Sequence, residues 1–357
     1  METFWIKPKL YFGPEPMAAL DQLAGKRVLI VTDAFLASSG LLDRVKNRLT
    51  GAVEIFDQVE PDPSLRLVAQ GVRMLRDFGP DAVVAFGGGS PMDCAKGMCW
   101  FSDRHPPLWC IPTTAGTGSE VTSFAVLTDT DQGVKYPLVE EDLLPEAAIL
   151  DASLLEGVPP HVTADTGMDV LTHASEAYVA RKANAFTDAL AEQAFVLAWE
   201  NLIKAHAAKG EHPAKEQMLL ASCMAGIAFN GAGLGANHAL AHSLGGRYHT
   251  PHGRLNAMLM PHVIRFNAEE PAAAKKYAAL AKACGLAPNA RALSSALGRL
   301  RQSLGMPGRL TDCGVERKTV LADLEAITAA ALADVCMPGN PRSAAAAELA
   351  AIVREVL

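Results

Sequence analysis

The sequence predicts an α/β domain built on a parallel sheet over residues 1–157, followed by an all-helical domain over residues 158–357. Three observations lead to this fold class. The chain has 357 residues, about twice the length of an ordinary domain of ~150 residues. Short β-branched runs alternate with helical stretches in the first half, and they nearly vanish after residue 160 or so, where Ala, Leu, Glu and Lys dominate. Because 50% of the residues are hydrophobic, both halves can bury a core.

Four apolar runs of buried-strand length organise the first half, at residues 28–32, 52–56, 82–86 and 108–111. Segments with helical spacing lie between or after them, at residues 36–49, 64–78 and 91–102. Short continuous apolar strands joined by helices are typical of a parallel sheet that is covered on both faces. The first half is therefore predicted to be an open, Rossmann-like α/β layer.

The second half is predicted to be helical throughout. The segment 187–198 places good helix formers at core-facing intervals, and the Ala-rich stretch 344–351 predicts a terminal packing helix. Two prolines, Pro159 and Pro160, interrupt regular structure and mark the boundary between the domains.

Charge and composition exclude several classes of protein. The 32 basic and 39 acidic residues give a net charge of −7 without a long Lys/Arg run, so we expect no nucleic-acid partner and no membrane partner. No run reaches the ~18 apolar residues of a membrane span, and the first residues lack a secretory-signal pattern. The seven cysteines are scattered without a C-x-x-C pair, which suits a reducing cytosol. We therefore expect a cytoplasmic protein.

A glycine-rich loop at residues 86–93 follows a predicted strand and opens a predicted helix. Its three consecutive glycines are Gly87, Gly88 and Gly89. Ser90 fits an N-cap, Pro91 the first helical position, and Asp93 the acid of a capping box. Free N–H groups at a helix start, behind a turn that lets the backbone approach a ligand, bind anions. The loop is therefore predicted to hold a phosphate or pyrophosphate, the alternative being a tight turn with no ligand.

A second polar loop, residues 111–120, contains Thr113 and Thr114 and follows the next strand. Two such loops converge on the carboxyl edge of a parallel sheet, where nucleotides bind in open α/β folds. Asp33 ends the first strong strand; its carboxylate can accept hydrogen bonds from ribose hydroxyls and would repel a 2′-phosphate, which favours NAD over NADP. The alternative is that Asp33 caps the next helix.

A constellation of possible metal ligands lies in the second half. Asp169 and His173 are four residues apart, which places both on one face of a helix, and His238 and His242 repeat that spacing. His252 lies in a loop that soon follows. Neutral imidazoles with one carboxylate suit divalent iron or zinc, and an open coordination position would make the site catalytic. A lone histidine on a helix is more often a core residue, but the repeated spacing favours a metal site.

A nucleotide site in one domain and a metal site in the other predict hydride transfer from an alcohol in the cleft between them. A divalent ion would lower the pKa of the alcohol, whose hydride would then pass to the nicotinamide.

These motifs resemble those of the iron-containing (group III) alcohol dehydrogenase family over essentially the whole chain. The resemblance is carried by residues 86–93, 111–120, 167–174 and 238–253. It implies the fold that this family shares with dehydroquinate synthase, in which a dinucleotide-binding α/β domain precedes an all-α metal-binding domain.

The family resemblance also implies a role for particular residues. The implied metal ligands are Asp169, His173, His238 and His252. His242 would lie beside the nicotinamide and the substrate, in the proton path, and Phe229 would wall the substrate pocket. The implied cofactor-binding residues are Asp33, Gly87, Gly88, Gly89, Ser90, Asp93, Thr113, Thr114 and Lys135.

Within the family, the sequence is most similar to dehydrogenases of propanediol-utilisation microcompartments. This implies a homo-oligomer that acts on a short primary alcohol or aldehyde such as 1-propanol or propanal, recycles NADH to NAD, and works in the cytoplasm, inside a microcompartment with its other proteins. The implied cofactors are NAD(H) and Fe²⁺, with Zn²⁺ as the alternative. Two residues depart from the family pattern: Asp62 stands where many members carry Asn, and Cys94 where Ala is frequent.

Three alternatives compete with this interpretation: a zinc-dependent polyol or glycerol dehydrogenase, a lyase of the dehydroquinate synthase type, and a non-catalytic microcompartment scaffold. The lyase would need basic residues to hold an anionic substrate, and only Arg247 and Arg254 lie near the metal motifs. The scaffold would tolerate the loss of metal ligands, yet all four are present.

Overall fold

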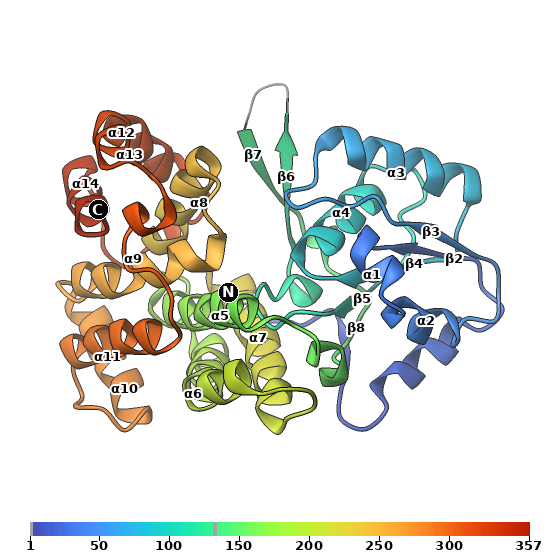
Figure 1. The fold of residues 1–357 in the computed structure, drawn as a ribbon, viewed down its shortest axis with the longest axis horizontal. Helices are drawn as coiled ribbons and strands as arrows, with labels where there is room; N and C mark the ends of the chain where they lie inside the picture. The colour runs from blue at the N-terminus through green and yellow to red at the C-terminus, as the bar shows by residue number, and fades with distance from the viewer. Residues whose placement is uncertain (1–2, 131–133) are drawn as a thin grey trace. The chain divides into compact units, whose positions relative to one another are not determined.

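The computed structural model describes residues 3–130 and 134–357, which form two compact units over residues 1–157 and 158–357 (Figure 1). Among the described residues no single helix is long and apolar enough to cross a membrane. Two helices of the second unit, α7 (Pro213–Ala232) and α8 (Ala236–Tyr248), are long and apolar enough only when taken together, and the chain bends by 104° between them.

A six-stranded parallel sheet in the order β1-β8-β5-β4-β2-β3 forms the centre of the first unit. Its strands are β1 (Lys9–Tyr11), β2 (Val28–Val31), β3 (Val53–Phe56), β4 (Ala82–Gly87), β5 (Leu108–Pro112) and β8 (Ala147–Ile149). The four predicted strands are confirmed as β2, β3, β4 and β5. Strands β2 and β4 are completely buried, which explains why their sequences are continuous apolar runs. The three-residue strands β1 and β8 were not predicted.

Helices cover both faces of this sheet, as predicted. They are α1 (Ala34–Ser38), α2 (Leu41–Lys46), α3 (Leu65–Phe78), α4 (Gly89–Trp100) and the 3-10 segments η1 (Pro16–Leu23), η2 (Ser119–Val121), η3 (Glu141–Leu143) and η4 (Ala152–Leu155). Ile30 of β2 packs in one hydrophobic cluster with Leu42 of α2, and the neighbouring Leu29 packs in another with Leu75 of α3. The predicted helix 36–49 is divided into α1 and α2, because Gly40 takes a φ of 79°.

An antiparallel pair, β6 (Phe124–Asp129) and β7 (Val134–Val139), also belongs to the first unit and was not predicted.

The second unit is all-helical, as predicted, and residues 158–357 contain no strand. Its α-helices are α5 (Pro160–Val179), α6 (Ala185–Ala207), α7 (Pro213–Ala232), α8 (Ala236–Tyr248), α9 (His252–Asn267), α10 (Pro271–Ala283), α11 (Ala290–Ser303), α12 (Arg317–Ala322), α13 (Leu324–Ala333) and α14 (Ala346–Glu355). Two 3-10 segments, η5 (Leu310–Cys313) and η6 (Met337–Gly339), complete it. The predicted terminal helix is confirmed, since Leu349 and Val353 of α14 pack into a hydrophobic cluster with residues of α8, α9 and α13.

Close helix packing in this unit positions the predicted metal ligands. A Cβ added at Gly253, the second residue of α9, would lie 2.1 Å from the carbonyl oxygen of Asp165 on α5. Only glycine lets the start of α9 approach the backbone of α5 so closely. Helix α5 itself is buried without a break from Gly167 to Val179, so the side chains on its inner face are enclosed.

Candidate active site

The glycine-rich loop joins β4 to α4 at the carboxyl edge of the sheet. Gly87 has a φ of 154°, and a Cβ there would lie 2.5 Å from Cγ of Pro91, so this position requires glycine. Gly88 is the N-cap of α4 and no side chain caps the helix, which leaves its first N–H groups to an outside acceptor. The predicted N-cap at Ser90 and helix start at Pro91 are wrong, since the helix begins two residues earlier.

The second polar loop lies against the glycine-rich loop, as predicted for neighbouring parallel strands. The Thr113 amide donates to the Gly87 carbonyl at 3.0 Å. A Cβ added at Gly88 would lie 3.2 Å from Oγ1 of Thr114, and one added at Gly89 would lie 3.0 Å from Cγ2 of Thr117. The two loops therefore enclose a cradle, and it stays open because Gly88 and Gly89 have no side chains to fill it.

Asp93 does not form the predicted capping box. Its carboxylate accepts hydrogen bonds from Ser119 Oγ at 2.9 Å and from the Val126 amide at 3.0 Å, and burial raises its pKa. Lys96, one turn later, is also buried and donates to Ser119 Oγ at 2.9 Å. Asp93 thus fastens α4 to the second loop and to β6, while its predicted place in the cofactor groove stays a prediction.

Glu120, in the same loop, gives the first unit a pH-dependent stability. Its side chain is buried, and burial raises the pKa of this carboxyl to about 7 from an ordinary 4.5. The folded protein holds the proton more tightly than the unfolded chain does, so the carboxyl stabilises the fold below pH 4.5 or so, and this contribution is lost as the pH rises through about 7.

We expect Glu120→Gln to remove this loss. The variant should gain about 2–3 kcal/mol in free energy of unfolding at pH 8 relative to the parent, and change little at pH 4.5. Denaturant unfolding of both proteins at the two pH values measures the difference. An identical pH dependence in parent and variant would show that folding does not raise the pKa of this carboxyl.

Asp33 is the N-cap of α1, with its Oδ1 accepting a hydrogen bond from the Leu36 amide at 2.8 Å. The helix-cap alternative is therefore correct, and the predicted ribose contact stays a prediction for the other carboxylate oxygen. A pocket of about 730 Å³ lies beside it at the carboxyl ends of β2 and β3, lined by Ala34, Glu60 and Asp62 among others. Asp62 has a φ of 57°, a conformation that Asn and Asp adopt more readily than most residues.

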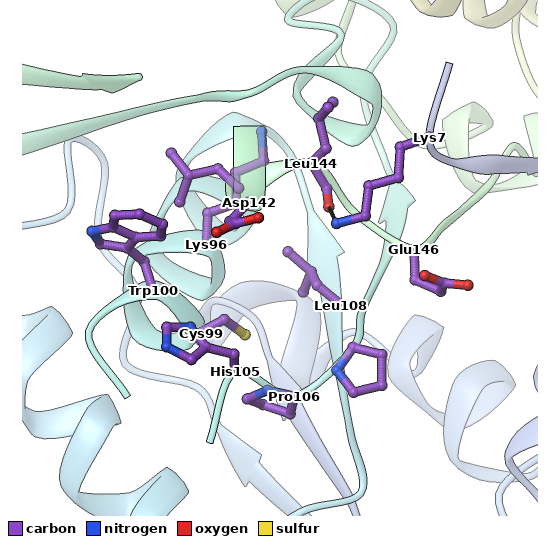
Figure 2. Close-up of a pocket in the computed structure, with 12 residues that line it drawn as sticks. Lys7, Lys96, Cys99, Trp100, His105, Pro106, Leu108, Asp142, Leu144 and Glu146 are labelled. Atoms are coloured by element: carbon purple, nitrogen blue, oxygen red, sulfur yellow. Dashed lines mark hydrogen bonds between the residues drawn. The ribbon is translucent and has the colours of Figure 1, made fainter. Parts of the chain in front are cut away.

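Another pocket of the first unit, of about 470 Å³, contains none of the predicted site residues (Figure 2). His105, Pro106 and Leu108 line it at the amino end of β5, and Glu146 lines it at the amino end of β8. Nucleotides bind at the opposite, carboxyl edge of open α/β sheets, so this pocket is not part of the candidate site. Lys135 lies in β7, but its side chain is outside the part of the chain that the structure describes.

The four predicted metal ligands come together in the second unit. One ligand atom from each of Asp169, His173, His238 and His252 lies within 4.8 Å of all the others. Asp169 Oδ1 is 3.7 Å from Nε2 of His238 and 3.6 Å from Nε2 of His252. Ligands of an ion bound at ~2.1 Å stand about 3.0–3.4 Å apart, so the set is close to the size of a coordination sphere.

The four ligands differ in their exposure, and one side of the cluster is open. Asp169, His173 and His238 are 3%, 5% and 1% exposed, whereas the side chain of His252 is 40% exposed. A bound cation would therefore be enclosed on three sides, with room for a further ligand beside His252.

The electrostatics of the cluster favour a cation. Burial opposes ionisation of Asp169, but the surrounding imidazoles outweigh it and hold its pKa below the ordinary value. Partial burial and the neighbouring imidazoles of His238, His242 and His173 lower the pKa of His252, although Asp169 opposes this shift. Burial also lowers the pKa of His238, but hydrogen bonds to Asp169 and Glu176 outweigh it and raise the pKa to about 9. The carboxylates of Asp169 and Glu176 thus stabilise positive charge at the cluster, which a proton on His238 or a metal cation can supply.

Two residues around the cluster were missed in the sequence. Asn256 is fully buried, and its Nδ2 donates to Asp169 Oδ1 at 2.6 Å. Glu176 is 4% exposed, and its Oε2 pairs with Nδ1 of His238. Both could have been found by extending the helical spacing, because Glu176 lies three residues after His173 and Asn256 four residues after His252.

His242 lies next to the cluster but outside the four-ligand set. Its ring stacks on that of His252 with centroids 5.2 Å apart, and its Nδ1 is 2.9 Å from Oδ2 of Asp334. Phe229 of α7 stacks on His173 with ring centroids 4.6 Å apart. These positions suit the implied roles of His242 and Phe229, which stay predictions.

The basic residues near the metal motifs are paired with carboxylates. Arg254 Nη2 lies 2.9 Å from Asp165 Oδ2, and Arg247 Nη1 lies 3.5 Å from Asp323 Oδ2. Neither is therefore a ready partner for an anionic substrate.

A parallel α/β unit with a glycine-lined cradle and a helical unit with three imidazoles and a carboxylate fit an oxidoreductase, and the comparisons with known proteins show that the chain is one. The chain belongs to the iron-containing alcohol dehydrogenase family. The model of that family, "Iron-containing alcohol dehydrogenase", matches residues 7–152, and the model "Fe-containing alcohol dehydrogenase family, C-terminal" matches residues 163–357. The family match favours an alcohol dehydrogenase over the polyol dehydrogenase and the lyase.

Individual relatives agree with this assignment. The chain is 45% identical to 1-propanol dehydrogenase PduQ of Salmonella typhimurium, with all of both chains covered. Its fold matches a crystal structure of 1,3-propanediol oxidoreductase with a TM-score of 0.93 and 38% identity, again over all of both chains. It also matches sulfoacetaldehyde reductase from Bifidobacterium kashiwanohense in complex with NAD⁺, with a TM-score of 0.90 and 27% identity over 100% of this chain and 98% of that one.

Proposed function

We propose that the protein is an NAD(H)-dependent dehydrogenase that interconverts short primary alcohols and aldehydes, such as 1-propanol and propanal. The observation that carries this proposal is the convergence of Asp169, His173, His238 and His252 around one point that is open on a single side. Similarity to a 1-propanol dehydrogenase supports the substrate class.

The residues of the cluster fit divalent iron. One hard carboxylate oxygen and three borderline imidazole nitrogens suit Fe²⁺ and also Zn²⁺. We propose iron as the native ion because of the family, and zinc as the alternative.

We propose that the first unit binds NAD(H). The cradle formed by Gly87, Gly88, Gly89 and Ser90 would hold the pyrophosphate, with Thr113 and Thr114 beside it. Asp93 would fix the groove, and Asp33 would face the adenosine ribose. The NAD⁺ complex of a related reductase supports this cofactor.

In the proposed reaction, RCH₂OH and NAD⁺ give RCHO, NADH and a proton. A divalent cation held by Asp169, His173, His238 and His252 would supply Lewis-acid chemistry that lowers the pKa of the alcohol hydroxyl. Asp334 accepts a hydrogen bond from Nδ1–H of His242, which leaves the lone pair of His242 Nε2 to take up the hydroxyl proton. The His242 side chain is 30% exposed and passes this proton to solvent. Phe229 and the buried ligands keep water from the rest of the site.

We infer that the enzyme forms a homo-oligomer, and that it regenerates NAD from NADH inside a cytoplasmic microcompartment. Resemblance to dehydrogenases of propanediol utilisation supports this inference. Light scattering of the purified protein tests assembly, and co-purification with shell proteins tests encapsulation.

An anaerobic assay tests the function. Protein purified without oxygen and loaded with Fe²⁺ is expected to oxidise NADH in the presence of C2–C4 aldehydes. It is expected to oxidise NADH much faster than it oxidises NADPH. Metal analysis of protein as purified distinguishes iron from zinc. No NADH oxidation by fully loaded protein with any of these aldehydes would contradict the proposal.

Asp33→Gly is expected to weaken the preference for NADH over NADPH by roughly 10-fold or more, since the variant lacks the charge that repels a 2′-phosphate. The ratio of kcat/KM for the two cofactors measures this effect. Asp33→Asn separates charge from capping, because Asn keeps an N-cap acceptor. If both variants kept the full preference of the parent for NADH, Asp33 would have no part in discrimination.

A further inference from the structure

Glu176 continues the ligand-bearing face of α5. Asp169, His173 and Glu176 occupy positions i, i+4 and i+7, and so lie one above another on the same side of the helix. Glu176 is 4% exposed, but it does not belong to the group of four side chains whose ligand atoms converge. A buried carboxylate next to a metal cluster needs partners, and its two oxygens have different ones.

The first oxygen of Glu176 completes the start of α8. Oε1 accepts a hydrogen bond from the Asn237 amide at 2.7 Å. Gly235, the N-cap of α8, has no side chain to cap the helix, and a Cβ there would lie 3.0 Å from this oxygen. Asn340 Oδ1 accepts from the Ala236 amide at 3.0 Å in the same way. Side chains from outside α8, one on α5 and one just after η6, therefore hold the segment that carries His238.

The second oxygen of Glu176 holds the imidazole of His238. Oε2 pairs with Nδ1, while Nε2 of the same ring lies 3.2 Å from Asn256 Nδ2, which can only donate, and 3.7 Å from Asp169 Oδ1. A carboxylate can only accept, so the proton of a neutral His238 must stay on Nδ1, and the lone pair of Nε2 then faces the cluster.

We propose that Glu176 is a positioning residue for the metal: it fixes His238 in the Nδ1–H tautomer and presents Nε2 to the cation. It also supplies a second negative charge, so that Asp169 and Glu176 together balance a divalent ion among three neutral imidazoles. This proposal rests on the proposed metal site but not on the substrate or on NAD.

Glu176→Gln separates the two tasks of the carboxylate. Glutamine has a single acceptor oxygen, which cannot serve both the Asn237 amide and His238 Nδ1. If the oxygen caps α8, the side-chain NH₂ faces Nδ1 and favours the Nε2–H tautomer, which cannot bind a metal through Nε2. Glu176→Gln is therefore expected to lower metal affinity 10–100-fold.

The test is a chelator competition with Co²⁺, whose visible absorption also reports on the ligand geometry. Glu192→Gln is the matched control, because Glu192 is a carboxylate of the same unit that accepts from Tyr178 Oη at 2.6 Å. The control should bind Co²⁺ like the parent, and Glu176→Gln should bind it 10–100-fold more weakly, with an altered spectrum. Folded Glu176→Gln with parental Co²⁺ affinity and spectrum would overturn the proposal and leave Glu176 only as a helix cap.

A second measurement keeps the proposal falsifiable if Glu176→Gln does not fold. In ¹⁵N-histidine-labelled parent loaded with Zn²⁺, the ring that is missing from the spectrum of His238→Ala should carry its proton on Nδ1. A proton on Nε2 of that ring would overturn the proposal. Neither readout uses catalysis. If the parent protein bound metal but did not oxidise alcohols, the proposed function would therefore be refuted, while the proposal for Glu176 would not.

Discussion

His252→Ala is expected to lose its metal and its turnover together. His252 is the one ligand on the open side of the cluster, and its side chain is 40% exposed, so its removal should break the coordination sphere without emptying a core. Lewis-acid stabilisation by a metal is worth several kcal/mol, which corresponds to a fall in kcat of ~10³-fold. Metal content per chain and kcat, both measured without oxygen, check this expectation.

His262→Ala is the matched control for that experiment. His262 lies on the same helix, α9, but its Nδ1 contacts Arg265 Nη2 at 2.8 Å and it is not part of the cluster. The control is expected to keep its metal and its activity. If His252→Ala also kept both, His252 would not be a ligand, and the four-residue site would have to be revised.

Gly253→Ala is expected to disturb the same site from the backbone. The new Cβ would lie 2.1 Å from the carbonyl oxygen of Asp165, so the start of α9 must move away from α5. The distance between His252 on α9 and Asp169 on α5 would then increase. We expect a loss of about 2–3 kcal/mol in free energy of unfolding and at least a ~10-fold loss in metal affinity. Denaturant unfolding and chelator competition measure these two quantities.

Gly246→Ala provides the comparison for this substitution. Gly246 is also helical, in α8, and a Cβ there would meet nothing within 4 Å. The change should stabilise the helix by up to about 1 kcal/mol and leave metal affinity as it is. Equal stability and equal metal affinity in the two variants would mean that the contact between α5 and α9 does not position the site.

The sequence predicted those elements whose signal is local. Strands such as β4 are buried on both faces and therefore appear as unbroken apolar runs. Strand β1 has only three residues and an exposed-to-intermediate burial pattern, so its place in the sheet depends on pairing with β8 and not on its own composition. The start of α4 was placed two residues late, because Ser90 and Pro91 resemble a standard helix start while the actual N-cap, Gly88, has no side chain.

The same distinction applies to the site. Asp169 and His173 share a helix face, and so do His238 and His242, and such spacing is visible in a sequence. Asp334 contacts His242 across 92 residues, and no periodic pattern links the two positions. Glu176 continues a visible helix face, yet its role depends on which atom of His238 it contacts, and only the structure shows that atom.

The most direct test of the account is a crystal structure of the metal-loaded protein with the ion located by anomalous scattering. The account predicts one ion per chain at about 2.0–2.3 Å from a carboxylate oxygen of Asp169 and from one ring nitrogen each of His173, His238 and His252. An ion bound elsewhere, or one that lacks any of these four ligands, would contradict it.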